Sequence, residues 1–220
     1  MSTFEKIHQA AIDRHGEEGL KARLPSPSDD TTLRQLPDDW YLSQMSLRIF
    51  STGLKHEMVK AKWPAFEEAF HGFDPAKVGF MNDDDLGQLL TDARLIRHGG
   101  KMRATLHNGA AMQDITNSQG GFGAYLADWP GTDTVGLWED LGKRFKHLGG
   151  NSAPYFLRMV GKDTFTMSKD VVRGMSHWQG SENADKNKTA KKQMQNHFND
   201  WASETGRPLC QLSMILALST

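Results

Sequence analysis

The segment 145-FKHLGGNSAPYFLRMV-160, in which a glycine pair separates two helical patterns, indicates the fold most clearly. Gly149 and Gly150 permit backbone conformations closed to other residues and let the backbone approach a partner closely. Asn151 or Ser152 can cap the helix that follows. The segment predicts two helices joined by a tight turn, which is either an ordinary helical corner or a helix-hairpin-helix whose turn holds a DNA phosphate.

Outside this segment, apolar residues recur at helical spacing along almost the whole chain, and strand-like alternation is scarce. Capping residues and proline mark helix starts in FDP at 73–75 and NDDD at 82–85. The sequence therefore predicts an all-α fold of many short helices. We expect helices over residues 4–14, 38–51, 55–71, 74–81, 83–92, 94–117, 121–128, 132–146, 150–161, 168–177 and 188–204.

The length of 220 residues suits a single domain that needs no disulfide, so we expect residues 1–220 to form one domain. The loop LPSPSDD at 24–30 separates an N-terminal appendage, residues 1–37, from the body. The polar stretch 179–192 predicts a mobile loop that leads into the next helix. The last helices, within residues 188–220, are expected to dock back on the body.

Composition excludes several classes of protein. The single cysteine, Cys210, cannot form an intramolecular disulfide or a cysteine-rich zinc site, and it suits a reducing cytoplasm. No segment has the apolar length of a membrane span or the apolar core of a signal peptide, so we expect a cytoplasmic protein without membrane contact. The formal net charge of −1 argues against general DNA coating and leaves nucleic-acid binding to local patches.

Two local clusters of basic residues are candidates for such patches. Residues 139–173 contain seven lysines and arginines against four acidic residues. Residues 93–111 contain four basic residues and no acid, with Lys101 in the turn HGGK. Both clusters suit contact with phosphates, although an ordinary exposed helix surface carries the same pattern.

Asp170 stands where a helix is expected to begin, two residues after Ser168. Either residue can simply cap that helix, because side-chain oxygens accept hydrogen bonds from the first N–H groups. A carboxylate at a helix start near a DNA-holding hairpin could also stabilise a developing sugar cation or orient a water molecule. The sequence leaves both roles open.

His56 lies near two aromatic residues, Phe50 and Trp63, in the stretch 47–66. The nine histidines of the chain show no tight ligand spacing with carboxylates, so no metal site is expected. Aromatic residues at helical spacing are more often core, but these could also form a pocket in which a base stacks.

Three stretches together resemble the 3-methyladenine DNA glycosylase I family. The longest is FEEAFHGFDPAKVGFMNDDDLGQLLTDARLIRHGGKMRATLHNGAA at 66–111, which keeps the phenylalanine-aspartate-proline and isoleucine-arginine-histidine elements in register. LRIFSTGLKHEMVKAKWPAF at 47–66 aligns with the pocket helices of the family, and FKHLGGNSAPYFLRMVGKDTFTMSKDVV at 145–172 with its hairpin and the next helix. The match covers about residues 42–175.

The resemblance implies a helix-hairpin-helix DNA glycosylase fold and an enzyme of base excision repair. Such an enzyme flips a damaged base out of double-stranded DNA and hydrolyses its N-glycosidic bond. A purine methylated at N3 is cationic, so it is already a good leaving group and can be selected by aromatic stacking and cation–π attraction. The expected activity is a monofunctional glycosylase for an alkylated purine, foremost 3-methyladenine.

The resemblance also assigns the site residues. The turn Gly149, Gly150, Asn151 and Ser152, with Lys101, would contact DNA, and its carbonyl groups could hold a monovalent cation. The base pocket would contain Phe50, His56, Trp63 and Arg48. Asp170, eighteen residues after Ser152, stands where the wider superfamily keeps an aspartate that assists formation of the sugar cation.

The chain departs from the family pattern in three places. Residues 1–40 replace the usual N-terminal motif. Arg48 stands at a pocket position where many members have glutamate, and His56 where they have tryptophan. Cys210 is alone, so we expect neither the family zinc nor another cofactor. The departures at Arg48 and His56 favour one alternative, a DNA-binding protein of the same fold that has lost or changed catalysis; a helical interaction module ranks last. We expect a monomer.

Overall fold

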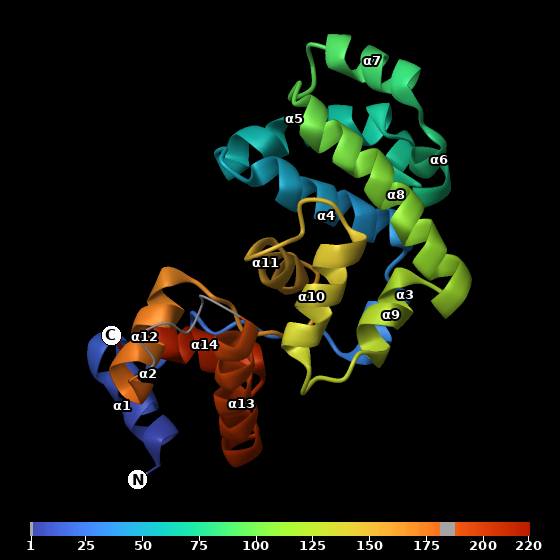
Figure 1. Ribbon diagram of the computed structural model, residues 1–220. Coiled ribbons are helices and arrows are strands. Elements are labelled where there is room, and N and C mark those ends of the chain that lie inside the picture. The colour runs from blue at the N-terminus through green and yellow to red at the C-terminus, as the bar shows by residue number, and fades with distance from the viewer. Residues whose placement is uncertain (1, 181–187) are drawn as a thin grey trace. The chain divides into compact units, whose positions relative to one another are not determined.

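The computed structural model describes residues 2–180 and 188–220, and every regular element in these ranges is a helix (Figure 1). This confirms the all-α fold. Backbone contacts divide the chain into two compact units, which are described separately. The first unit contains the described residues of 1–28, 130–137 and 161–220, and the second contains residues 29–129 and 138–160.

The second unit carries the hairpin and most of the predicted site. It consists of α3 (Asp30–Gln35), α4 (Asp38–Ser51), α5 (His56–Ala69), the 3₁₀ turn η1 (His71–Phe73), α6 (Pro75–Phe80), α7 (Asp83–Thr91), α8 (Gly99–Gln119), α9 (Phe122–Asp128), the later part of α10 (Thr134–Arg144) and α11 (Ser152–Met159).

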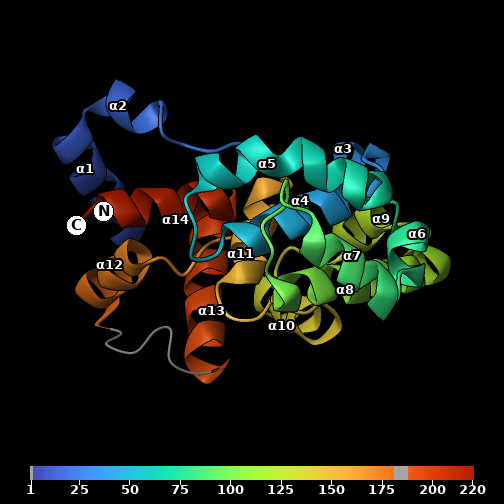
Figure 2. The same ribbon diagram turned by 90° about the horizontal axis from the view of Figure 1, so that it is seen from above.

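Helix α8 is the central element of the second unit and contacts α4, α6, α7 and α9. Figures 1 and 2 both show α4 and α6 beside it. The approach of α6 to α8 depends on two glycines: a Cβ added at Gly109 would lie 2.8 Å from Val78 Cγ1 and 2.9 Å from the Gly79 nitrogen. Because real Cβ atoms do not come this close, larger residues would push the helices apart.

An aromatic cluster fills the core between α4, α5 and η1. The rings of Trp63 and Phe66 stack with centroids 5.0 Å apart, and Phe50 meets Phe66 at 4.7 Å with its edge. Phe73 continues the stack at 5.3 Å from Trp63. Burial of such large rings is a main contribution to the stability of a domain of this size.

The first unit combines the two ends of the chain. It contains α1 (Thr3–His15), α2 (Glu17–Lys21), the start of α10, α12 (Lys169–Gln179), α13 (Lys188–Thr205) and α14 (Leu209–Leu218). Helix α14, which contains the last apolar segment, packs against α1, α12 and α13 within this unit. The N-terminal segment is thus held by C-terminal helices.

Several boundaries differ from the sequence prediction. The helix predicted over 94–117 begins only at Gly99, because His98 has extended backbone angles and its ring accepts a hydrogen bond from the Lys101 N–H. Helix α3 was not predicted; it starts after Asp29, whose carboxylate accepts a hydrogen bond from the Thr32 N–H. Short helix α2 was also missed. Half of the predicted loop over 179–192, residues 181–187, is outside the described residues, and residues 188–192 already belong to α13 (Lys188–Thr205).

Among the described residues, no helix has both the length and the apolar character that crossing a membrane requires.

Candidate functional site

The turn between α10 and α11 has the tight geometry that its glycines predict. Gly150 has a φ of 61°, in the left-handed region that favours glycine, and His147 adopts a φ of 62° although it carries a side chain. The Ser152 N–H donates to the Gly149 carbonyl over 3.2 Å. Strained backbone at a non-glycine residue often marks a functional position.

Of the two candidate caps, Asn151 and Ser152, the first is wrong. Asn151 is the N-cap of α11, but its side chain makes no capping hydrogen bond. Its backbone angles, φ −81° and ψ −4°, are helical, whereas a capping side chain reaches the N–H groups from an extended backbone. The first turn of α11 is therefore not covered by a side chain of its own N-cap, which suits the binding of an external anion.

Helix α8 anchors the turn through Asn108, which is fully buried. The Lys146 N–H donates to Asn108 Oδ1 over 2.7 Å, and Asn108 Nδ2 donates to the Lys146 carbonyl over 3.1 Å. Next to it, His107 Nε2 lies 3.2 Å from the Arg144 carbonyl oxygen. Because both backbone groups of Lys146 are paired to one amide, the turn has a fixed position against α8.

The turn borders an open depression with a volume of about 430 Å³. Its lining comes from α4 and the residue after it, from α8 and from the turn, and consists of Ile49, Thr52, Lys101, His147, Gly149 and Ser152. The structure thus brings Lys101 together with Gly149 and Ser152, three of the five predicted DNA-contacting residues. Gly150 and Asn151 lie in the same turn.

The Lys101 side chain is fixed in position by burial and hydrogen bonds. It is only 8% exposed, and its ammonium group donates to the carbonyl oxygens of Phe50 over 3.1 Å and Thr52 over 2.7 Å. Burial lowers the pKa of this ammonium group. Two of its three N–H donors are used at the end of α4, and one remains for another acceptor.

The basic residues over 139–173 are divided between the two units, and two of them are paired with acidic side chains. Arg144 pairs with Asp140 over 2.6 Å, and Arg173 pairs with Asp170 over 2.8 Å. Lys162, Lys169 and Arg173 belong to the first unit. Near the turn, Lys143 and Lys146 are exposed and form no ion pair with any described residue.

The predicted base-pocket residues occupy different environments. Phe50 is fully buried and Trp63 is 7% exposed. The Trp63 Nε1–H donates to Ser43 Oγ over 2.9 Å. Both rings therefore pack beneath the surface, where they can support residues that contact a base but cannot stack on the base themselves. His56 is exposed at the start of α5, with Nδ1 lying 3.0 Å from Ser51 Oγ.

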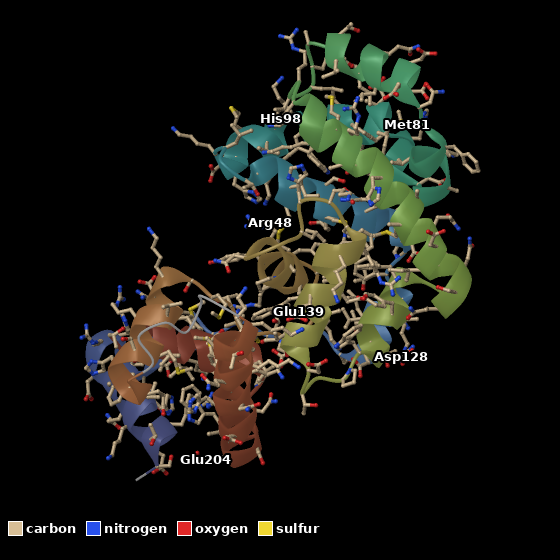
Figure 3. The ribbon with its side chains drawn as sticks, viewed as in Figure 1. Arg48, Met81, His98, Asp128, Glu139 and Glu204 are labelled. Carbon is tan, nitrogen blue, oxygen red and sulfur yellow. The ribbon has the colours of Figure 1, made fainter. Side chains whose placement is uncertain are left out.

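Arg48 is half-buried where α4 faces α11 (Figure 3). Its guanidinium carbon lies 5.0 Å from the centroid of the Tyr155 ring, a cation–π arrangement. Its Nε is buried without a hydrogen-bond partner, and burial lowers the pKa of the side chain. No carboxylate within residues 2–180 and 188–220 forms an ion pair with it.

Asp170 lies in the first turn of α12 and is exposed. The capping role belongs to Ser168, whose Oγ accepts from the Val171 N–H over 3.2 Å, while the Asp170 carboxylate pairs with Arg173. Asp170 is part of the first unit and the hairpin turn is part of the second. Its catalytic role stays a prediction.

Asn108, His147 and Tyr155 were not predicted as site residues from the sequence. Asn108 stands in the stretch 66–111 that resembles the family, and this resemblance could have marked it as a site residue. The contact between Tyr155 and the Arg48 guanidinium group is visible only in the folded chain. Among the described residues, no group of three or more histidine, cysteine, aspartate or glutamate side chains is arranged to hold a metal ion.

The candidate site therefore lies in an all-helical unit in which a glycine turn stands beside a buried lysine. The family model for methyladenine glycosylases matches residues 34–142. This part of the chain, just under half of its length, is similar to the methyladenine glycosylase family.

Individual relatives share parts of the chain. DNA-3-methyladenine glycosylase 1 of Escherichia coli (strain K12) is 41% identical over 59 residues, which span 27% of this chain and 32% of that protein, about a third of its length. A structure of 3-methyladenine DNA glycosylase I from Staphylococcus aureus, solved to explain 3-methyladenine recognition, superposes with a TM-score of 0.53 at 21% identity over 69% of this chain and 91% of that one. A mutant of the Staphylococcus aureus enzyme gives a TM-score of 0.52 at 24% identity, covering 57% of this chain and 77% of that one. These likenesses confirm the glycosylase-like fold.

Proposed function

We propose that the chain is a monofunctional DNA glycosylase of base excision repair that acts on double-stranded DNA carrying an alkylated purine, with 3-methyladenine the first base to test. The observation that carries the proposal is the shared depression in which Lys101 meets Gly149 and Ser152 of the hairpin turn. A lysine donor and a backbone turn converging on one hollow suit a DNA phosphate.

The hairpin would hold the phosphate next to the flipped nucleotide. The Lys101 ammonium group has one donor beyond its two carbonyl partners, and the first turn of α11 lacks a cap from its own N-cap side chain. The exposed ammonium groups of Lys143 and Lys146 would add salt-dependent attraction to the backbone. The proposal includes no zinc and no organic cofactor; a monovalent cation at the hairpin carbonyls is compatible with it.

The chemical step would be hydrolytic. The bond between C1′ of the sugar and the base nitrogen breaks, the base leaves with the bonding electrons, and the oxygen of a water molecule bonds to C1′ while that water gives up one proton to a carboxylate. A carboxylate close to C1′ stabilises the positive charge that develops on the sugar and orients the water. Asp170 is the residue we propose for this role, and the protein would act as a monomer.

The second candidate function is binding to lesions or distorted DNA without base release. The observation that favours it is Arg48, an arginine without a carboxylate partner among the described residues, at a position expected to face the base. A cation there disfavours binding of a cationic base. A protein with this change could still bind lesions or distorted DNA but no longer release the methylated base.

One experiment separates the two functions. Methylated duplex DNA is incubated with wild type, Asp170→Asn, Arg173→Gln and Asp114→Asn, and released bases are measured. We expect release by wild type, a loss of at least tenfold on Asp170→Asn, and little change in the other two. Arg173→Gln breaks the same ion pair but keeps the carboxylate, and Asp114→Asn removes an exposed carboxylate of α8.

If wild type releases no base from a panel of alkylated purines but binds DNA in a salt-sensitive way, the binding function is the better description. If Asp170→Asn retains full release, catalysis does not depend on this carboxylate.

A further inference from the structure

Arg48 has an unusual electrostatic setting for a residue in the interior of a unit. It is half-buried, its Nε–H is buried without an acceptor, and no described carboxylate neutralises it. Among the described residues, Tyr155 is a titratable group close enough to act on it electrostatically. Since an arginine stays protonated in proteins, α4 presents a permanent positive charge here.

The position of this charge relates it to the hairpin. Arg48 is next to Ile49 and one turn before Thr52, and both of these line the depression beside the turn. Its partner Tyr155 follows Ser152, another lining residue, by three positions on α11. At 1.5 Å per residue, this is about 4.5 Å along the helix axis. A nucleotide whose phosphate is held at the turn would therefore extend its base toward the Arg48–Tyr155 pair.

The pair also has a defined chemistry. A guanidinium group has five N–H donors and no acceptor, and here its carbon lies 5.0 Å from the centroid of the Tyr155 ring. In DNA recognition, arginine donates two parallel hydrogen bonds to O6 and N7 of a purine. A base that carries a positive charge meets like-charge repulsion at this surface, whereas a neutral base with a carbonyl group supplies the missing acceptors.

We propose that Arg48 makes this site selective for neutral purines with a carbonyl acceptor at position 6, such as hypoxanthine, over cationic methylated purines. The inference rests on the proposed function in one respect, namely that a flipped base enters the site beside the hairpin. The inference changes the preferred substrate of the glycosylase. Cationic methylated purines, which leave easily because of their charge, are replaced by neutral purines that are recognised through their hydrogen-bond acceptors.

The test measures binding, so it does not depend on catalysis. Duplexes carry 2′-fluoro nucleotides, whose glycosidic bonds resist hydrolysis, with hypoxanthine as the neutral base or 7-methylguanine as the cationic base. A third duplex carries a tetrahydrofuran abasic site and reports on backbone contacts alone. Affinities are measured for wild type, Arg48→Gln, Arg48→Lys and Arg34→Gln, the last removing a surface arginine of α3 that pairs with Asp128.

We expect wild type to bind hypoxanthine DNA about tenfold more tightly than 7-methylguanine DNA, the size of effect that one partly screened like charge produces. Arg48→Gln should bring the ratio close to one. Arg48→Lys should still discriminate against the cationic base but lose affinity for hypoxanthine, because a lysine cannot donate two parallel hydrogen bonds. Arg34→Gln should resemble wild type, and all four proteins should bind the abasic duplex alike.

A wild-type preference for 7-methylguanine, or an unchanged ratio in both Arg48 variants, would overturn the inference. Base release is measured in parallel on cleavable duplexes. Release without the binding preference defeats the Arg48 inference and leaves the glycosylase function standing; the preference without release supports the inference and defeats the glycosylase function. Failure to bind any duplex at low salt defeats both.

Discussion

Lys101 closes the end of α4: its ammonium group donates a 2.7 Å hydrogen bond to the carbonyl oxygen of Thr52. The same group lies at the wall of the depression that the hairpin turn borders. Capping the end of α4 does not by itself require that Lys101 line this depression. We infer that it links the stability of α4 to the binding of a phosphate.

The first prediction concerns Lys101→Met. Loss of the ammonium group leaves the carbonyls of Phe50 and Thr52 without their donor, which should destabilise the protein by about 1–3 kcal/mol. If the third N–H contacts a phosphate, the slope of log affinity against log salt should also fall by about 0.9. Urea unfolding and DNA binding at several salt concentrations measure the two effects.

Lys62→Met is the matched control. Its ammonium group also donates to two carbonyls, those of Ala93 and Arg94, but this half-buried lysine of α5 lies outside the depression. We expect it to leave the salt slope unchanged. An unchanged slope in Lys101→Met as well would make Lys101 a purely structural residue.

The second prediction concerns the attachment of the turn. Asn108→Ala removes both hydrogen bonds to Lys146 and leaves a buried cavity, so we expect a loss of stability of about 1–3 kcal/mol. Affinity for a duplex with an abasic site should fall at least fivefold at a temperature where the variant is still folded. Asn117→Ala removes an exposed amide of the same helix that pairs with Gln113 and should change neither property. Full affinity in Asn108→Ala would mean that the turn holds its shape without α8.

How far the sequence predicts this site depends on whether a feature is local. The glycine turn could be predicted because backbone freedom belongs to Gly149 and Gly150 themselves, and the helical spacing of apolar residues made the all-α fold evident. The late start of α8 could not, because it depends on a hydrogen bond between the ring of His98 and the backbone of Lys101. Helix α3 could not be predicted because its six residues are too few to show a helical periodicity of apolar positions.

Contacts between distant residues explain the remaining differences. The sequence treats Phe50 and Trp63 as pocket residues, yet stacking with Phe66 and Phe73 buries them, and no periodicity distinguishes a pocket ring from a core ring. Arg48 and Tyr155 are more than one hundred positions apart, so only the packing of α4 against α11 brings them together. The family resemblance located the helices of the site but not these pairings.

The third prediction concerns pH and the first unit. Burial, and to a smaller extent the charge of Arg207, lower the pKa of His8 below its ordinary value. The unfolded chain therefore binds a proton at His8 more readily than the folded one. The stabilisation from neutral His8 is complete above about pH 6.5 and is lost as the pH falls below that value.

Thermal unfolding of wild type and His8→Gln between about pH 8 and about pH 5 tests this. The Tm difference between the two proteins should shift in favour of the variant as the pH falls, because glutamine cannot take up the proton. Comparing the two cancels the titration of carboxylates that they share. A Tm difference that does not vary with pH would show that His8 titrates alike in the folded and unfolded states.

The last prediction separates backbone conformation from phosphate contact in the hairpin turn. A Cβ at either Gly149 or Gly150 meets nothing within 4 Å, so neither substitution creates a clash inside the protein. Gly150 has a φ of 61°, and an alanine there should cost about 1 kcal/mol of stability, whereas Gly149 is outside the left-handed region and should accept alanine freely. Gly149 lines the depression, so its new methyl group would stand where a phosphate must approach. We therefore expect Gly149→Ala to keep its unfolding free energy and lose DNA affinity at least tenfold, and Gly150→Ala to lose stability as well. Because alanine causes no conformational strain at Gly149, a loss of affinity there would report on the phosphate contact itself. Equal DNA affinity in Gly149→Ala and wild type would place the phosphate elsewhere.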